Sequence, residues 1–247
     1  MQTRQEDGLL NSVEVNSAVQ PPRLSIIMPM LNEAATMKVA LTPLQPLRYA
    51  KIIEVIVVDG ESADNSVQIA QPLADLVLSS TPSRALQMNV GAQHACAPAL
   101  LFLHADTRLP EGAVEQVTQA LNVYAWGRFE IKLAGRSRWL PIVSWMMNQR
   151  SRLTHIATGD QGMFMRASIF QEAGGFPEQP LMEDIELSKR LKKCSPPACL
   201  RAKVISSGRR WDEFGAWKTI RLMWRLRYRY WRGVSATQLV KEYRDAR

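Results

Sequence analysis

Cysteine and histidine are both scarce in this sequence. Among 247 residues there are three cysteines, Cys96, Cys194 and Cys199, and three histidines. The cysteine count is odd and no Cys-x-x-Cys pair occurs, so the sequence predicts neither a disulfide framework nor a structural zinc site. A reducing compartment, the cytoplasm, is therefore expected.

Long hydrophobic runs are also lacking. No stretch approaches the roughly 18 consecutive apolar residues of a membrane-spanning helix. The first 20 residues are polar and mixed in charge, without the basic start and apolar stretch of a signal peptide. We expect a disordered polar tail over residues 1–22, and a chain that neither crosses a membrane nor is exported.

An excess of acidic charge is absent as well. The net charge is +8, and it is concentrated at one end. Residues 201–247 hold 13 Lys and Arg against 4 Asp and Glu, whereas residues 1–200 hold 18 against 19. The body is thus neutral and the C-terminal fifth is strongly basic, while a hydrophobic content of 46% excludes a disordered chain.

Short apolar runs alternate with longer helical patterns in the first half of the chain. The expected strands span residues 24–30, 55–58, 76–78 and 99–103, and the expected helices span 34–47, 64–70 and 84–95, the first shortened by Pro43 and Pro46. This alternation predicts βαβ units and an α/β fold with a mostly parallel central sheet flanked by helices. Further on, we expect an apolar segment at 139–147, a strand at 163–165 and a helix at 183–193.

A polar cluster follows each of the four expected strands. The clusters are Asn32–Glu33, Asp59–Ser62, Ser83–Arg84 and His104–Asp106. The carboxyl ends of parallel strands meet at one edge of a sheet, where open α/β folds bind their ligands. The sequence therefore predicts one cleft lined by four loops.

Three of these positions carry groups with a specific chemistry. Asp59 is either a turn aspartate or a carboxylate that accepts hydrogen bonds from a nucleotide base or ribose. His104 and Asp106 lie two residues apart and would suit Mn²⁺ or Mg²⁺ bridging a diphosphate, although Asp106 or Thr107 could instead cap a helix that begins near Glu111.

A pair of acids, Glu183 and Asp184, opens the expected helix at 183–193. One of them could be a general base in a cleft of low dielectric. The alternative is that both acids complement the helix dipole, because the basic residues of this helix, such as Lys189 and Arg190, lie at its far end. The spacing leaves both interpretations open.

Five motifs stand out along the chain: Pro29–Glu33, Val57–Asp64, Leu103–Thr107, Gly159–Gln161 and Met182–Asp184. In this order, and over about residues 24–211, they resemble the motifs of family 2 glycosyltransferases. The resemblance implies a GT-A fold, a nucleotide-sugar donor with a UDP-sugar expected first, a divalent metal, and inversion at the anomeric carbon. It also implies a GT-A domain over residues 23–211 and a basic, aromatic-rich helical extension over 212–247.

The resemblance also implies roles for individual residues. Asp184 would be the general base with Glu183 beside it, Asp106 would hold the metal with His104, and Arg84 would face the nucleotide or its phosphates. Arg209, Arg210 and Trp211 resemble a shortened Gln-x-x-Arg-Trp motif. The implied donor-binding residues are Pro29, Asn32, Glu33, Asp59, Arg84, Asn89, His104, Ala105, Asp106, Arg209, Arg210 and Trp211, and the implied acceptor-binding residues are Gly159, Asp160 and Gln161.

The chain departs from the family pattern at two positions. His104 stands where the first aspartate of Asp-x-Asp is expected, and Gly60 stands where Val-Asp-Asp-Gly-Ser has its second aspartate.

Two other functions compete with glycosyl transfer. A nucleotidyltransferase would also need a metal and a nucleotide but usually has a glycine-rich loop after the first strand, which residues 28–33 lack. A nucleic-acid-binding module would use the basic extension, although the neutral body and its acidic cleft argue against nucleic acid as a partner.

The extension carries two parallel stripes at helical spacing. The aromatic stripe consists of Trp217, Ile220, Trp224, Tyr228 and Trp231, and the basic stripe of Arg221, Arg225, Arg229 and Arg232. Either the aromatic stripe packs on the catalytic domain, or the helix lies in the interface of an anionic membrane. The second interpretation predicts peripheral attachment to the cytoplasmic face and a lipid-linked acceptor. The sequence names neither the sugar, the base of the donor, the acceptor nor the oligomeric state.

Overall fold

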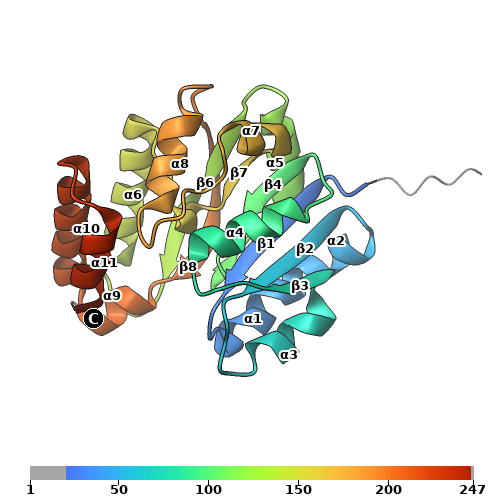
Figure 1. Cartoon of the computed structure of the whole chain (residues 1–247), viewed down its shortest axis with the longest axis horizontal. Helices are drawn as coiled ribbons and strands as arrows, with labels where there is room; N and C mark the ends of the chain where they lie inside the picture. Colours follow the sequence, from blue (N-terminus) through green and yellow to red (C-terminus); the bar gives the residue numbers. More distant parts are fainter. Residues whose placement is uncertain (1–20, 246–247) are drawn as a thin grey trace, which may run out of the picture.

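A single mixed sheet forms the centre of the molecule. The computed structural model describes residues 21–245, so the tail predicted over 1–22 lies almost wholly outside the described residues. Within them, eight strands form one sheet in the order β3-β2-β1-β4-β7-β6-β8-β5. Helices flank this sheet (Figure 1), which confirms the expected α/β class.

The strands predicted in the first half are all present and pair in parallel. They are β1 (Leu24–Met30), β2 (Ile53–Asp59), β3 (Leu76–Ser79) and β4 (Ala99–Phe102). The helices between them are α1 (Ala34–Leu41), α2 (Gln45–Tyr49), α3 (Ser66–Ala70) and α4 (Arg84–Gln93), with 3₁₀ turns η1 (Thr42–Leu44) and η2 (Gln71–Leu73). The helix predicted over 34–47 is broken because Pro43 and Pro46 each begin a new helical segment.

The second half closes the sheet with one strand predicted at 163–165 and three strands that the sequence analysis did not predict. Its elements are β5 (Thr107–Arg108), α5 (Ala113–Leu121), β6 (Trp126–Ala134), α6 (Leu140–Thr154), η3 (Gly159–Gln161), β7 (Met163–Arg166), α7 (Ala167–Glu172), α8 (Glu183–Leu191) and β8 (Ala198–Ser207). β7 is antiparallel to both β4 and β6, and β8 is parallel to β6. The sheet is therefore parallel in its first half and mixed in its second.

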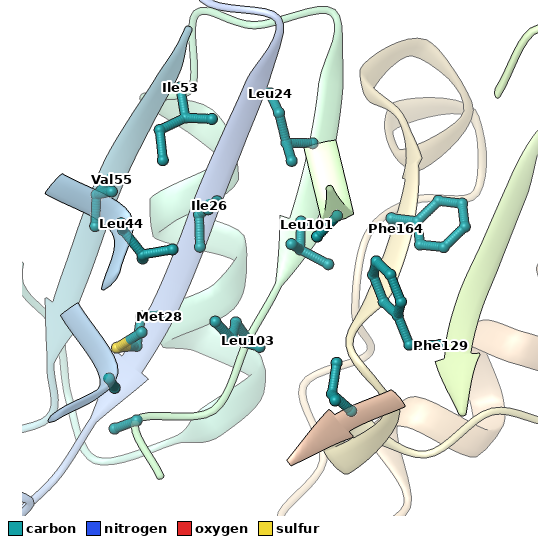
Figure 2. Packing of buried hydrophobic residues seen from close by; sticks show 14 of the residues in the cluster. Leu24, Ile26, Met28, Leu44, Ile53, Val55, Leu101, Leu103, Phe129 and Phe164 are labelled. Atoms are coloured by element: carbon teal, nitrogen blue, oxygen red, sulfur yellow. The ribbon is translucent and has the colours of Figure 1, made fainter. Parts of the chain in front are cut away.

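Two apolar layers cover the two faces of the sheet. Ile26 and Met28 of β1 pack with α1 and α5, whereas Ile27 between them packs with α4 and α8. Figure 2 shows part of the first layer, with side chains of β1, β2 and β4 beside the rings of Phe129 and Phe164. This period of two fixes the register of β1, because a shift by one residue would exchange its faces.

The C-terminal extension forms three helices at one end of the molecule (Figure 1). They are α9 (Arg209–Phe214), α10 (Ala216–Trp231) and α11 (Ala236–Asp245). Leu226 of α10 and Leu239 of α11 are buried against Met182 and Ile185, at the start of α8. The extension is thus anchored beside the acidic pair, and α9 spans the boundary predicted at residues 211 and 212.

No helix within residues 21–245 combines the length and apolar character needed to cross a membrane.

Candidate functional site

A cleft of about 1300 Å³ opens at the carboxyl ends of the parallel strands. Its walls come from the loops after β1 and β4, from the start of α4, and from α6, α8, α9 and α10. The predicted site residues that line it are Pro29, Asn32, Glu33, Arg84, His104, Ala105, Asp106, Asp160, Glu183, Arg209, Arg210 and Trp211. Asp59, Asn89, Gly159, Gln161 and Asp184 are not among the described lining residues.

Asp59 ends β2 and is almost fully buried. Its Oδ2 accepts a hydrogen bond from the Ser62 N–H at 3.0 Å, while its Oδ1 is buried without a partner among the described residues. A buried carboxylate oxygen is costly when it accepts nothing, so Oδ1 fits the expected role of an acceptor for a ligand donor group.

Gly60 has a local reason for departing from the family pattern. The Gln87 side chain of α4 donates to the carbonyls of Met30 and Val58, both at 2.8 Å, and so ties α4 to the ends of β1 and β2. A Cβ at position 60 would lie 2.9 Å from Gln87 Nε2. An aspartate at this position would therefore have to displace the Gln87 amide from the two carbonyls that it binds.

The loop after β1 is tied to the loop after β2. Asn32 adopts a left-handed φ of 55°, its N–H donates to Ser62 Oγ at 2.9 Å, and its Oδ1 accepts from the Ala63 N–H at 2.8 Å. The Asn32 side chain thus shapes this wall of the cleft. Glu33 lies 3.7 Å from the Arg209 guanidinium, which joins α9 to the same wall.

His104 and Asp106 lie at the floor of the cleft. His104 Nδ1 is 3.5 Å from Asp160 Oδ1, and Nε2 is buried with no partner among the described residues. Gly159 makes room for this nitrogen, since a Cβ there would lie 2.5 Å from Nε2. Burial, with Arg84 nearby, lowers the pKa of His104 and keeps the ring neutral.

These groups fit a divalent metal only when other ligands complete it. Residues 21–245 contain no cluster of three or more His, Cys, Asp or Glu side chains able to hold an ion. One imidazole and one carboxylate, His104 and the half-buried Asp106, remain. Mn²⁺ and Mg²⁺ can be bound by as few as one or two protein side chains when phosphate oxygens supply the other ligands. The unpartnered His104 nitrogen is consistent with this arrangement.

The acidic pair occupies the first turn of α8. Met182 before it has a φ of 66°, a strained value for a residue with a side chain. Burial, and next the charge of Asp184, raise the pKa of Glu183 to about 7. Burial therefore outweighs the helix dipole, which would lower the pKa of an acid in this position.

The two acids differ in their surroundings. Glu183 Oε1 lies 3.8 Å from Arg84, on the side of the first strands. Asp184 accepts hydrogen bonds from the N–H groups of Gly159 at 2.9 Å and Ile185 at 2.7 Å, and burial raises its pKa. Asp184 thus lies against the Gly159–Asp160 turn, which separates it from the described lining of the cleft.

Two predicted site residues hold the fold together instead of lining the cleft. Both ends of the Asn89 amide are bonded to the backbone of Phe176. Gln161 is fully buried, closes a capping box with Thr158, and reaches Asn148. We therefore do not assign Asn89 to donor binding or Gln161 to acceptor binding.

Two arginines in the cleft were missed by the sequence analysis, Arg150 of α6 and Arg227 of α10. Arg150 follows the apolar segment expected at 139–147, so in the sequence it resembles an exposed polar residue at the end of that segment. Arg227 lies off the basic stripe of the same helix, on the side of Ile220 and Met223. This position off the basic stripe was the one sign in the sequence that Arg227 differs from the other arginines of the helix. The packing of α10 is what shows that the difference places Arg227 in the cleft.

The model of the glycosyl transferase family 2 matches residues 25–174. This range covers more than half of the chain and includes four of the five motifs, whereas the Met182–Asp184 motif lies beyond it. No curated protein shows significant similarity to the chain.

Solved structures share the fold at low sequence identity. The mannosyltransferase PcManGT from Pyrobaculum calidifontis, in complex with GDP-Man and Mn²⁺, is 18% identical with a TM-score of 0.63, over 83% of this chain and 62% of that one. S. aureus TarS 1–349 in complex with UDP-GlcNAc is 17% identical with a TM-score of 0.57, over 75% and 58%. The chain spans about three fifths of the length of these structures, and the likeness confirms the expected GT-A fold.

Proposed function

The chain belongs to glycosyl transferase family 2, and on that premise we propose that it moves a sugar from a nucleotide-diphosphate donor to an acceptor hydroxyl with inversion. One observation carries the proposal. Two buried polar atoms have no partner within residues 21–245: Asp59 Oδ1, at the end of β2, and His104 Nε2, just after β4 at the same edge of the sheet. Two neighbours with this fold are complexes with nucleotide sugars, GDP-Man and UDP-GlcNAc.

The donor occupies the side of the cleft formed by the first strands. Asp59 accepts a hydrogen bond from the nucleoside, and Arg84 and Arg210 face the diphosphate. Asp106 and His104 would hold Mn²⁺ or Mg²⁺, which when bound neutralises the negative charge of the diphosphate. Glu183, at 3.8 Å from Arg84, holds that guanidinium in place.

The acceptor enters from the side of Asp160 and α10. Asp184 takes the proton of the acceptor hydroxyl as that oxygen forms its bond to the anomeric carbon and the bond to the diphosphate breaks. The leaving diphosphate carries away the bonding electrons, next to the positive charge of Arg84 and Arg210. One displacement on the face opposite the leaving group inverts the anomeric centre.

Product analysis tests this function. The full chain is incubated with Mn²⁺ and a panel of UDP- and GDP-sugars, and nucleotide sugars that bind are first identified by thermal shift, because a ligand of the folded state raises Tm. We expect release of free nucleoside diphosphate. Release of pyrophosphate from a nucleoside triphosphate and a sugar phosphate would favour the nucleotidyltransferase alternative. Salt-dependent DNA or RNA binding without any nucleotide-sugar binding would favour the nucleic-acid module.

An exposed aromatic surface beside the cleft supports a membrane location for this activity. α10 packs inward through Leu226, while Trp217, Trp224, Tyr228 and Trp231 are all more than half exposed. The surface continues to the start of α6, where the ring of Trp139 lies 5.4 Å from that of Trp217. Aromatic rings on an outward helix face are typical of helices that lie in a membrane interface. Arg221 and Arg232 are exposed next to these rings, whereas Arg225 and Arg229 pair with Glu242 of α11.

We expect the protein to sediment with vesicles that contain anionic lipid, to be released by high salt, and to ignore neutral vesicles. Replacing Trp217 and Trp231 together by serine should weaken vesicle binding by about tenfold or more, because two exposed indoles are lost. Tyr49→Ser is the matched control, since Tyr49 is 71% exposed on α2, outside this surface. If the protein sediments with neither anionic nor neutral vesicles, the membrane location is refuted and a freely dissolved acceptor is favoured.

A further inference from the structure

Two cleft arginines have no role in the reaction described above. Arg150 reaches the cleft from α6 and Arg227 from α10, two helices that are distant in the sequence. Nε and Nη2 of Arg150 are buried, and neither has a hydrogen-bond partner among the described residues. Neither arginine forms an ion pair with any described carboxylate. Buried donors of a charged group are unfavourable when they have no partner, so Nε and Nη2 of the partly buried Arg150 point to an anionic ligand.

The electrostatic surroundings agree with this geometry. Burial, and next the positive charge of Arg227, lower the pKa of Arg150 to about 9. Asp184 and Asp160 are the nearest acids, and their charges favour the ionised form of both arginines. Two positive charges thus share one wall of the cleft without an ion pair to any carboxylate of residues 21–245.

These arginines lie on the acceptor side of the cleft. Arg84 and Arg210 are the cations that lower the pKa of His104. Arg227 is the cation whose charge most lowers the pKa of Asp184, whereas Arg84 interacts more strongly with Glu183 than with Asp184. The wall around Arg150 and Arg227 also includes Met146, Met147 and Met223. An apolar wall reduces the local dielectric and strengthens the attraction between a guanidinium and an anion.

We propose that Arg150 and Arg227 form an anion site for the acceptor, and that the acceptor is a hydroxyl compound carrying a phosphate group. Two guanidinium groups match the charge of a phosphate monoester, which is close to −2 at neutral pH, and can bind its oxygens in pairs. A carboxylate would neutralise only one of the two. The identification of this anion with the acceptor rests on the proposed glycosyl transfer.

Binding of simple probes tests the site. sn-Glycerol 3-phosphate, inorganic phosphate, glycerate and glycerol are titrated by calorimetry into the full chain, saturated with Mn²⁺ and with UDP or GDP so that the donor side is filled. We expect both phosphates to bind and glycerol to give no signal. Arg150→Gln and Arg227→Gln should each weaken phosphate binding by about tenfold or more. Arg221→Gln, the same change at an exposed position of α10, should leave it unchanged.

The outcomes separate this site from the donor site. Unchanged nucleoside diphosphate affinity in Arg150→Gln, with phosphate binding lost, supports the acceptor site. Loss of nucleoside diphosphate binding in that variant would overturn it and assign Arg150 to the donor. Glycerate binding as tightly as glycerol 3-phosphate, or phosphate binding that survives both substitutions, would also overturn it. If no nucleoside diphosphate binds the wild-type chain, the proposed function fails instead, and the phosphate titrations alone still decide whether the anion site exists.

Discussion

Replacing Asp106 by alanine will abolish turnover while the protein still folds. Asp106 is half-buried in the cleft, and the one hydrogen bond that its side chain makes with a described residue is a 3.2 Å bond from the neighbouring Thr107 hydroxyl to Oδ1. Its removal therefore disturbs the packing little but takes away the carboxylate that holds the metal against the diphosphate. We expect a loss of about a thousandfold or more in kcat, because a diphosphate whose charge is not neutralised is a poor leaving group.

The measurement is initial-rate kinetics at saturating donor, with and without metal. Removal of metal with EDTA should reproduce the loss in the wild-type enzyme, and Mn²⁺ should restore the activity. Glu115→Ala, at an exposed position of α5, is the matched control and should remain active. His104→Asp should also retain activity and change the preference between Mn²⁺ and Mg²⁺, since it restores the family carboxylate. Full activity after confirmed metal removal would refute the metal site and leave Arg84 and Arg210 to stabilise the leaving group.

The second large effect is expected for Asp184→Asn. Asparagine has nearly the same shape but cannot take a proton from the acceptor, so kcat should fall by about 10²- to 10⁴-fold. Donor binding should be spared, because Asp184 lies behind the Gly159–Asp160 turn, on the acceptor side. The amide can accept only one of the two backbone hydrogen bonds of the carboxylate, so some loss of Tm accompanies the change.

Glu183→Gln is the comparison that assigns the base. We expect a smaller loss in kcat, with weaker donor binding, because Glu183 faces Arg84. A greater kinetic loss in Glu183→Gln than in Asp184→Asn would transfer the role of base to Glu183. If neither substitution matters, the acids serve only the helix dipole.

The pH dependence of the rate provides an independent check on Asp184. The base must be ionised, so kcat/KM should be constant at high pH and fall as pH decreases through the pKa of Asp184. Burial raises that pKa above the ordinary value of 3.8, which moves the acid limb to higher pH than for an exposed aspartate. The acid limb assigned to Asp184 should be absent from the residual activity of Asp184→Asn.

Much of the first half of the fold was predictable because its signals are local. β1 and β2 are mostly apolar and are fully or almost fully buried, as expected of parallel strands covered on both faces. β6 was missed although Phe129, Ile131 and Leu133 alternate with charged residues. Its alternation includes Arg128, a fully buried arginine that resembles a surface residue in the sequence. β8 has no strong pattern, and its pairing with β6 provides its backbone partners.

The sequence by itself determined the family, the first four strands in their order along the chain, and the motifs that carry Asp59, His104, Asp106 and the acidic pair, because these depend on short motifs and on local periodicity. Only the tertiary structure decided which of these side chains face the cleft. It turned Asn89 and Gln161 into internal anchors, directed the aromatic side of α10 outward, and brought Arg150 and Arg227 into one wall. The physical reason is that the orientation of a helix is set by the apolar contacts it makes with elements distant in sequence, here by Leu226 against Met182 and Ile185. No local pattern around residue 150 or residue 227 contains those contacts.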